Sequence, residues 1–196
     1  MVAFIPVRND DRSAKWLTLT IHSVTCLEHR QNHPQAVSSN SPMLDKPEVT
    51  QTARQLTAII HLTIPRDEIQ EVMGPGLAEV RAVIAEQGIV ATGPWFTHHL
   101  RMDPDIFDFE ICVPVGSTVV ATGRVTPGEW PAMKVARTVY RGPFEGLGDA
   151  WGEFDDWIEA NGLTPGEDLW ERYVKGPESG PDPDQWCTEL NRPLVG

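Results

Sequence analysis

The sequence predicts an α+β fold in which two similar strand-helix-strand-strand units form one curved, mostly antiparallel sheet, with helices on one face and a ligand cleft on the other. Three observations predict it: segments that alternate apolar and polar residues, two segments with apolar residues every three or four positions, and the recurrence of this pattern in the second half. A chain of 196 residues is long enough to bury a core without disulfides or metals.

Composition excludes several classes of protein. The 28 acidic residues against 16 lysines and arginines give a net charge of -12, which argues against direct nucleic-acid binding. No apolar run approaches the roughly 20 residues that cross a membrane, and the first residues lack a signal-peptide pattern. Cys26, Cys112 and Cys187 lie far apart, without the spacing of a zinc site. We therefore expect a cytoplasmic protein that uses no membrane, structural metal or disulfide.

The first 45 residues differ from the rest. Residues 28–42 are polar, without periodic pattern, and end in proline, which is typical of a linker. Upstream, Leu17, Leu19 and Ile21 alternate with polar residues as an isolated short strand does. We expect residues 1–45 to be a poorly ordered extension and residues 46–196 to be the domain.

The first unit follows from residue 55 onward. In residues 55–65 apolar side chains alternate on one face, which predicts a strand ending at Pro65. Residues 67–88 have the spacing of a helix, with an interruption predicted at Gly74-Pro75-Gly76 and a stop at Gly88. Further strands are predicted at 93–100, at 107–115 and, after a turn at Pro127-Gly128, at 132–140.

The second unit repeats the first. Placing Gly162 on Gly88 aligns the apolar faces of two helices and brings "LWERYV" (169–174) onto "WFTHHL" (95–100). A further slip of five residues aligns "TELNRP" (188–193) with "FEICVP" (109–114). We interpret this as a duplication, with a cleft between the halves.

Glu171 is the first candidate functional residue. Strand geometry puts Glu171 and Tyr173 on one face, two residues apart. A carboxylate in an aromatic cleft is costly to desolvate, which raises its pKa and favours a positively charged ligand. The alternative is a solvent-facing glutamate on an edge strand, paired with Arg172 or a nearby lysine.

Aromatic residues are abundant, with seven Trp and six Phe. Trp151, Phe154 and Trp157 belong to the predicted helix face and are expected to fill the core. The remaining candidates either line a ligand pocket or pack in the core. These candidates are Trp95, Trp130 and Tyr140.

Histidines and further acids complete the set of candidates. His98 and His99 point to opposite faces of their strand and cannot share one metal, so no metal site is predicted. His99 aligns with Tyr173 and is a candidate for the cleft, although a core histidine with one hydrogen bond is the alternative. Glu110 and Glu189 occupy equivalent strand positions, and each faces either the cleft or solvent. Gly-rich phosphate loops, catalytic serine elbows and zinc helices have no match in the sequence, so no cofactor is expected.

Three segments carry a resemblance to a known family. The Gly-Pro-aromatic-Glu turn at 142–145, "LWERYV" and the Thr-Glu-x-x-x-Pro-Leu ending at 188–194 resemble the GyrI-like small-molecule-binding domain. This effector-binding fold occurs alone and at the C-terminus of multidrug-responsive and AraC-type activators. The resemblance, over roughly residues 50–195, implies a pocket between two duplicated halves and matches the family's buried acid to Glu171. Because no helix-turn-helix pattern precedes the domain, we expect a stand-alone member.

Three functions follow as hypotheses. The first is a binding module for a hydrophobic, possibly cationic small molecule, with Glu171 as its charge partner. The second, implied by some stand-alone relatives, is a hydrolase that opens strained cyclopropane-containing or alkylating toxins, with Glu171 as general base and Tyr173 or His99 as hydrogen-bond donor. The third is a gyrase-binding inhibitor whose acidic surface imitates DNA, for which acidity that serves solubility alone is the alternative.

Overall fold

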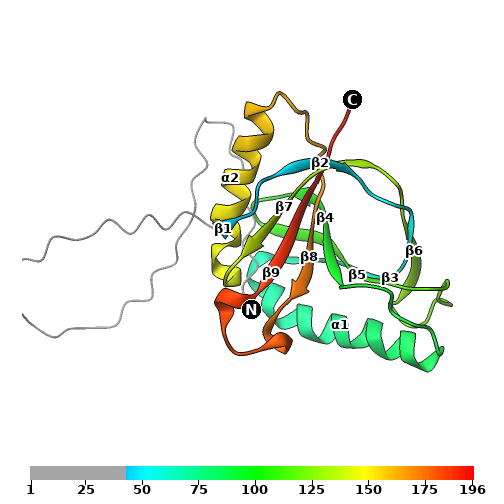
Figure 1. Cartoon of the computed structure of the whole chain (residues 1–196). Coiled ribbons are helices and arrows are strands. Elements are labelled where there is room, and N and C mark those ends of the chain that lie inside the picture. The colour runs from blue at the N-terminus through cyan, green and yellow to red at the C-terminus, as the bar shows by residue number, and fades with distance from the viewer. Residues whose placement is uncertain (1–42) are drawn as a thin grey trace, which may run out of the picture.

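A computed structural model describes residues 43–196, in which nine strands form one antiparallel sheet and two helices pack against it (Figure 1). The strand order is β1-β7-β9-β8-β4-β5-β3-β6, and β2 also pairs with β7. The sheet is strongly curved, with β2, β3 and β6 bending around one end (Figure 1). The strands are β1 (Met43–Leu44), β2 (Glu48–Gln51), β3 (Gln55–Pro65), β4 (Phe96–Met102), β5 (Ile106–Pro114), β6 (Thr126–Trp130), β7 (Lys134–Arg141), β8 (Leu169–Lys175) and β9 (Cys187–Pro193), and the helices are α1 (Ile69–Glu86) and α2 (Leu147–Ala160).

The topology confirms the predicted α+β class and its duplication. The units β3-α1-β4-β5 and β7-α2-β8-β9 have the same order of elements. Across the sheet, β7-β9-β8 is followed by β4-β5-β3, so the order of equivalent strands reads the same from both ends. The central pair joins β4 to β8, with Thr97 opposite Glu171. The two halves therefore meet at the strand that carries the candidate acid.

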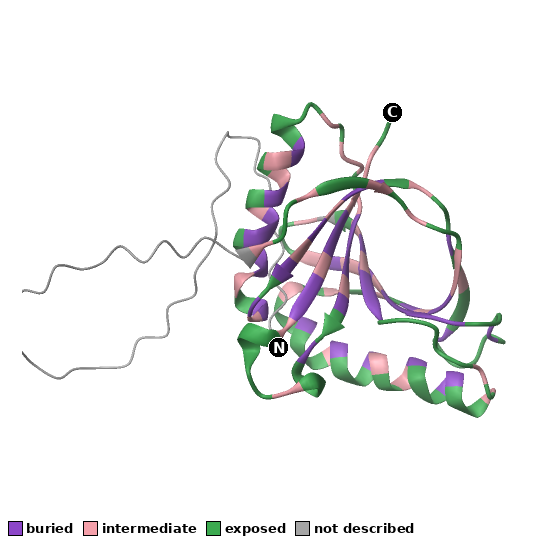
Figure 2. Ribbon diagram, in the orientation of Figure 1, coloured by how far each residue is buried: buried purple, intermediate pink, exposed green. Residues whose placement is uncertain are grey.

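The main core lies between the sheet and the helices. Trp151, Phe154 and Ile158 of α2 and Val80 and Ile84 of α1 are buried in it, and Figure 2 shows the buried side of each helix turned toward the strands. Burying these large apolar groups is the main source of folding free energy, at roughly 25 cal/mol per Å² removed from water.

The cleft does not lie where the prediction placed it. Glu171 and Tyr173 face the helices, because the indole of Trp151 from α2 contacts Glu171 directly. The face opposite the helices instead carries a smaller cluster that includes Trp170, next to Glu171 in the sequence. Strand alternation correctly separates these two sets of side chains, but it contains no information about which set faces the helices.

Helix α1 continues through Gly74-Pro75-Gly76, so the predicted interruption is wrong. An interior proline removes one backbone donor and crowds the carbonyl four residues earlier, and α1 accommodates both at Pro75 without ending. Gly76 leaves room for the core: a Cβ there would lie 2.6 Å from Cδ1 of Ile111, so the Ile111 side chain would have to shift. The stop at Gly88 is confirmed: its φ of 65° lies in the left-handed region, as does that of Gly162, the equivalent residue after α2.

The predicted turn at Pro127-Gly128 is also wrong, because both residues lie in β6. Pro127 pairs with Ala58 and Gly128 with Thr57. Strand β6 ends the strand order and has β3 as its neighbour, and proline is tolerated in edge strands because its missing N–H leaves no partner unsatisfied there.

Two expectations concern the N-terminal part. The possible strand at Leu17, Leu19 and Ile21 lies outside the described residues. Met43 and Leu44, which the predicted boundary assigns to the extension, pair with Arg141 and Tyr140 of β7.

Neither helix of the described part is both long and apolar enough to span a membrane.

Candidate functional site

The carboxylate of Glu171 lies in the middle of the sheet with 0% of its surface exposed. Its Oε1 accepts a hydrogen bond of 2.7 Å from the indole Nε1 of Trp151, and its Oε2 accepts one of 2.8 Å from the hydroxyl of Tyr173. No lysine, arginine or histidine of residues 43–196 forms an ion pair with it. The structure therefore excludes the solvent-facing, Arg172-paired alternative, since Arg172 instead contacts Glu189 at 3.6 Å.

Burial dominates the electrostatics of this acid. Removal from water raises the pKa of Glu171, and the hydrogen bonds from Trp151 and Tyr173 offset only part of that rise. Burial and the adjacent Glu171 together raise the pKa of Tyr173 well above its usual value of 10.0. The phenol therefore stays protonated and donates its hydrogen bond at neutral pH.

A chain of hydrogen bonds connects Glu171 through Tyr173 to residues of β4. The hydroxyl of Tyr173 lies 3.1 Å from Oγ1 of Thr97, which in turn lies 3.2 Å from Nε2 of His99. The imidazole of His99 is 1% exposed and stacks on Phe109. Burial, reinforced by the positive charges of His98 and Arg66, lowers its pKa to about 3, so it is neutral at physiological pH.

His99 is expected to make stability fall in acid. The unfolded imidazole takes up a proton below its ordinary pKa of 6.5, whereas the folded one resists until about pH 3. Folded stability is thus lost as the pH falls through this interval, by up to roughly 1.4 kcal/mol per pH unit.

Urea unfolding of the wild type and of His99→Gln at pH 7 and pH 5 measures this contribution. The variant should lose less stability over that interval. His61→Gln is the contrasting variant: His61 is 54% exposed and pairs with Asp108, so its replacement should not reduce the loss of stability toward acid. Equal pH dependence of all three proteins would contradict the neutral state of His99.

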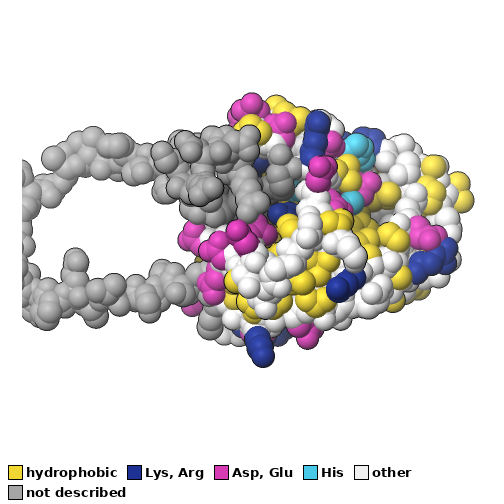
Figure 3. Space-filling model, turned by 90° about the horizontal axis from the view of Figure 1, so that it is seen from above, with side chains coloured by type: hydrophobic (Ala, Val, Ile, Leu, Met, Phe, Trp, Pro, Cys, Tyr) yellow, Lys and Arg dark blue, Asp and Glu magenta, His cyan; other side chains and the backbone are white. Residues whose placement is uncertain are grey.

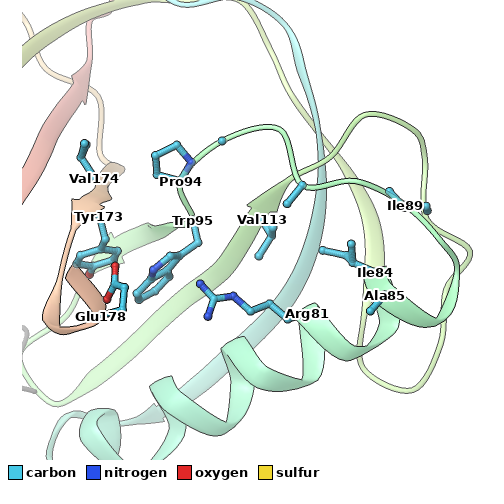
Figure 4. Close-up of a pocket in the computed structure, with 12 residues that line it drawn as sticks. Arg81, Ile84, Ala85, Ile89, Pro94, Trp95, Val113, Tyr173, Val174 and Glu178 are labelled. Atoms are coloured by element: carbon cyan, nitrogen blue, oxygen red, sulfur yellow. The ribbon is translucent and has the colours of Figure 1, made fainter. Parts of the chain in front are cut away.

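A cavity of about 400 Å³ lies beside Tyr173, between α1 and the strands (Figure 4). Its strand-side wall is the ring of Trp95, stacked on that of Tyr173 with centroids 4.2 Å apart. Tyr173 therefore has two roles, because its ring faces the cavity and its hydroxyl contacts Glu171. The full lining is Arg81, Ile84, Ala85, Ile89, Ala91, Gly93, Pro94, Trp95, Val113, Tyr173, Val174 and Glu178.

Five of the seven predicted ligand-binding residues are not part of the lining. Glu171 and His99 are buried in the core, joined to Tyr173 by the hydrogen bonds described above, and the other three lie elsewhere. Glu110 points to the opposite face, where it hydrogen-bonds His98 at 3.0 Å. Trp130 lies on that same face, with Phe96 and Trp170. Tyr140 lies in the main core, and its hydroxyl donates to the carbonyl of Pro143 at 2.8 Å.

His98 and His99 lie on opposite faces, as predicted. His98 is held between Glu110 and Asp168, at 3.0 and 2.9 Å. Burial lowers the pKa of His98, but hydrogen bonds to Asp168 and Glu110 outweigh this effect and raise it. Within the part of the chain that the structure describes, no group of three or more His, Cys, Asp or Glu residues is arranged to hold a metal ion.

Sequence reasoning missed four residues of this region. The helical pattern predicts only core packing for Trp151, and no pattern singles out Thr97, two residues before His99. Arg81 and Glu178 line the cavity from α1 and from the loop after β8. The only signal in the sequence is the helical spacing of Arg81, which lies three residues before the buried Ile84.

A second, smaller hollow of about 200 Å³ lies at the end of α2. It is the duplicate of the first: Ile158 corresponds to Ile84 and Leu163 to Ile89 in the repeat alignment. Charged residues, however, replace apolar ones, with Glu159 at the position of Ala85 and Arg192 at that of Val113. The duplication therefore produced two equivalent hollows, of which one is larger and has an aromatic wall.

The surface carries mixed charges. On the face seen in Figure 3, acidic side chains lie among arginines, lysines, histidines and exposed hydrophobic groups. On this face the negative net charge does not form one uninterrupted acidic surface.

A duplicated sheet with an aromatic-walled cavity beside a buried acid defines a small-molecule-binding domain. The chain belongs to the GyrI-like small-molecule-binding domain family, whose sequence model matches residues 45–194. The comparison with curated proteins finds no match.

Solved structures share this fold. The crystal structure of the EcmrR C-terminal domain matches with a TM-score of 0.69 at 20% identity, covering 76% of this chain and 97% of that one. In a cryo-EM structure of an EcmrR–DNA complex, the match covers 57% of the EcmrR chain and 76% of this one, with a TM-score of 0.66 and 21% identity. This chain thus spans little more than half of that protein.

Two further solved structures are similar at lower identity. SAV2435 bound to tetraphenylphosphonium matches with a TM-score of 0.57 at 14% identity, covering 78% of this chain and 95% of that one. A hydrolase from Listeria innocua matches with a TM-score of 0.56 at 15% identity, covering 76% and 92%. At these identities the similarity shows the fold alone.

Proposed function

We propose that the protein binds a hydrophobic, cationic small molecule in the cavity beside Trp95 and Tyr173, with Glu171 as its charge partner. The observation that carries the proposal is the Glu171 carboxylate, which is fully buried and has no cationic partner among the described residues.

A buried carboxylate needs compensation. Its two hydrogen-bond donors, Trp151 and Tyr173, are neutral and do not cancel its charge. An isolated charge in a medium of low polarity carries a large desolvation penalty, which is why the pKa of Glu171 is raised. A cation bound nearby supplies the missing charge, so ionisation of Glu171 and binding of the cation favour each other.

The cavity has the size and chemistry for such a ligand. Its volume of about 400 Å³ lies within the roughly 300–1,000 Å³ range of small-molecule sites. The electron-rich faces of aromatic rings attract cations. The Tyr173 hydroxyl donates a hydrogen bond of 2.8 Å to Glu171, and Tyr173 also lines the cavity. The negative charge of Glu171 is therefore separated from a bound cation only by this side chain.

Tetraphenylphosphonium, the compound bound to SAV2435, is a suitable probe. At 100 times its dissociation constant, a ligand adds about 2.7 kcal/mol of stability, which for a domain of this size raises the melting temperature by roughly 5–10 °C. Ala85→Trp, which fills the cavity, should abolish the shift. The control Ala82→Trp, at an exposed position of α1 outside the lining, should retain it.

Two results would contradict the proposal. One is the absence of a shift across a panel of lipophilic cations. The other is an undiminished shift in Ala85→Trp.

A hydrolase is the second candidate, favoured by the raised pKa of Glu171 beside a protonated Tyr173. Glu171 would take a proton from water while the water oxygen bonds to a carbon of a strained ring. The ring bond breaks, its electron pair moves to a conjugated oxygen of the substrate, and the proton held by Glu171 then passes to the product, which restores the carboxylate. Incubation with a cyclopropane-containing alkylator, with detection of the ring-opened product, tests it. Binding without product would leave the first function alone.

A further inference from the structure

We propose that the ligand is zwitterionic: besides its hydrophobic cationic part it carries an anionic group, such as a carboxylate, that Arg81 binds at the mouth of the cavity. This inference rests on the proposed function, because it concerns the same cavity and deepens the definition of its ligand.

Arg81 differs from the other arginines of residues 43–196. Seven of them have a carboxylate within 4.0 Å, and Arg66 hydrogen-bonds the carbonyl of Asp103. Within the same residues Arg81 has neither an ion pair nor a hydrogen bond. Its side chain is exposed on α1 and lines the cavity, and Figure 4 shows its guanidinium extending from the helix toward Trp95. A guanidinium in this position is an available partner for a carboxylate or phosphate.

The two sides of the cavity have opposite charge. On the side of β8, Glu178 lines the cavity and Glu171 lies behind Tyr173. Glu178 hydrogen-bonds only the backbone N–H of Gly176 in the described residues, at 3.2 Å, so its charge is not neutralised by a protein cation there. Arg81 contributes the positive charge from α1 on the other side (Figure 4).

This arrangement selects the charge pattern of a ligand. A simple cation satisfies Glu171 and Glu178 but is repelled by Arg81. A simple anion is attracted by Arg81 but repelled by Glu171 and Glu178. A zwitterion with its cation toward β8 and its anion toward α1 makes favourable interactions at both sides. Because Arg81 is exposed, we expect its pairing with the anion to strengthen binding only roughly 2- to 5-fold at low ionic strength.

Two phosphonium compounds of nearly equal size test the inference. (4-Carboxybutyl)triphenylphosphonium is a zwitterion at pH 7.5, and n-pentyltriphenylphosphonium has a methyl group in place of the carboxylate. Isothermal titration calorimetry should show that the wild type binds the carboxybutyl compound 2- to 5-fold more tightly. In Arg81→Met, which keeps an apolar stem but no charge, this preference should disappear. In the control Arg54→Met, which removes an equal charge from an arginine paired with Glu129, the preference should remain.

The outcomes distinguish this inference from the proposed function. Binding of the pentyl compound without preference for the carboxybutyl compound overturns the inference and supports the proposed function. A preference that persists in Arg81→Met also overturns it. If neither compound binds the wild type, the proposed function fails, and the inference fails with it.

Discussion

Glu171→Gln is expected to weaken tetraphenylphosphonium binding roughly 3- to 30-fold at pH 7.5, because it removes the negative charge that attracts the cation from behind Tyr173, without touching the ligand directly. Glutamine has nearly the same shape, and its carbonyl oxygen still accepts the hydrogen bond from Trp151, so the cavity itself is retained. Isothermal titration calorimetry measures the loss of affinity directly. Glu167→Gln, which removes an exposed charge just before β8, is the matched control and should bind as the wild type does.

The same variant reports on the ionisation of Glu171. Since the folded pKa of Glu171 is raised above its ordinary value of 4.5, the wild type is destabilised as the pH rises from 4.5 through the folded pKa. Glu171→Gln lacks this loss, so the difference in melting temperature between variant and wild type should grow in favour of the variant over that interval. Unchanged affinity in Glu171→Gln would show that the carboxylate is not the charge partner of the ligand. A pH-independent difference in stability would show that the carboxylate is not buried as described.

Trp151→Ala is expected to lower the free energy of unfolding by about 3–5 kcal/mol. Trp151 is fully buried, its ring lies 5.7 Å from that of Phe154, and its indole N–H is one of the two donors to Glu171. The truncation thus combines a large cavity with an acid that has lost a hydrogen bond. Because a domain is stable by only about 5–15 kcal/mol, this change removes a large part of the total.

The control for Trp151→Ala lies on the same helix. Trp157 is half-buried at the edge of the core, so Trp157→Ala should cost distinctly less. Trp151→Phe separates packing from hydrogen bonding, because it keeps an aromatic ring but removes the donor. Urea unfolding with a constant m-value measures all three. Equal losses in Trp151→Ala and Trp157→Ala would contradict the central position assigned to Trp151.

Much of the fold was predictable because local patterns determine it. The alternation in residues 55–65 marks β3 with its bounds unchanged, and the shared stop at Gly88 and Gly162 reveals the duplication. The pairing of Glu171 with Tyr173 follows from the two-residue period of a strand, and the structure joins them by a hydrogen bond of 2.8 Å.

The remaining features depend on contacts between distant segments. Nothing local indicates that the indole of Trp151 meets Glu171, 20 residues along the chain. The tolerance of Pro127 follows from the edge position of β6, and the close approach of Ile111 to Gly76 depends on how α1 packs on β5. Likewise, the assignment of Trp130 and Glu110 to the face away from the cavity depends on the order of strands in the sheet.

The two hollows at the ends of α1 and α2 bear on stoichiometry. A chain whose repeats had stayed identical would present two equal sites related by symmetry. Here Arg192 and Glu159 line the smaller hollow, whereas the small apolar side chains of Val113 and Ala85 stand at the equivalent positions of the larger one. Covalent joining of the repeats allows each copy to change alone, which a symmetric pair of identical subunits cannot do. The expected complex therefore contains one ligand molecule per polypeptide.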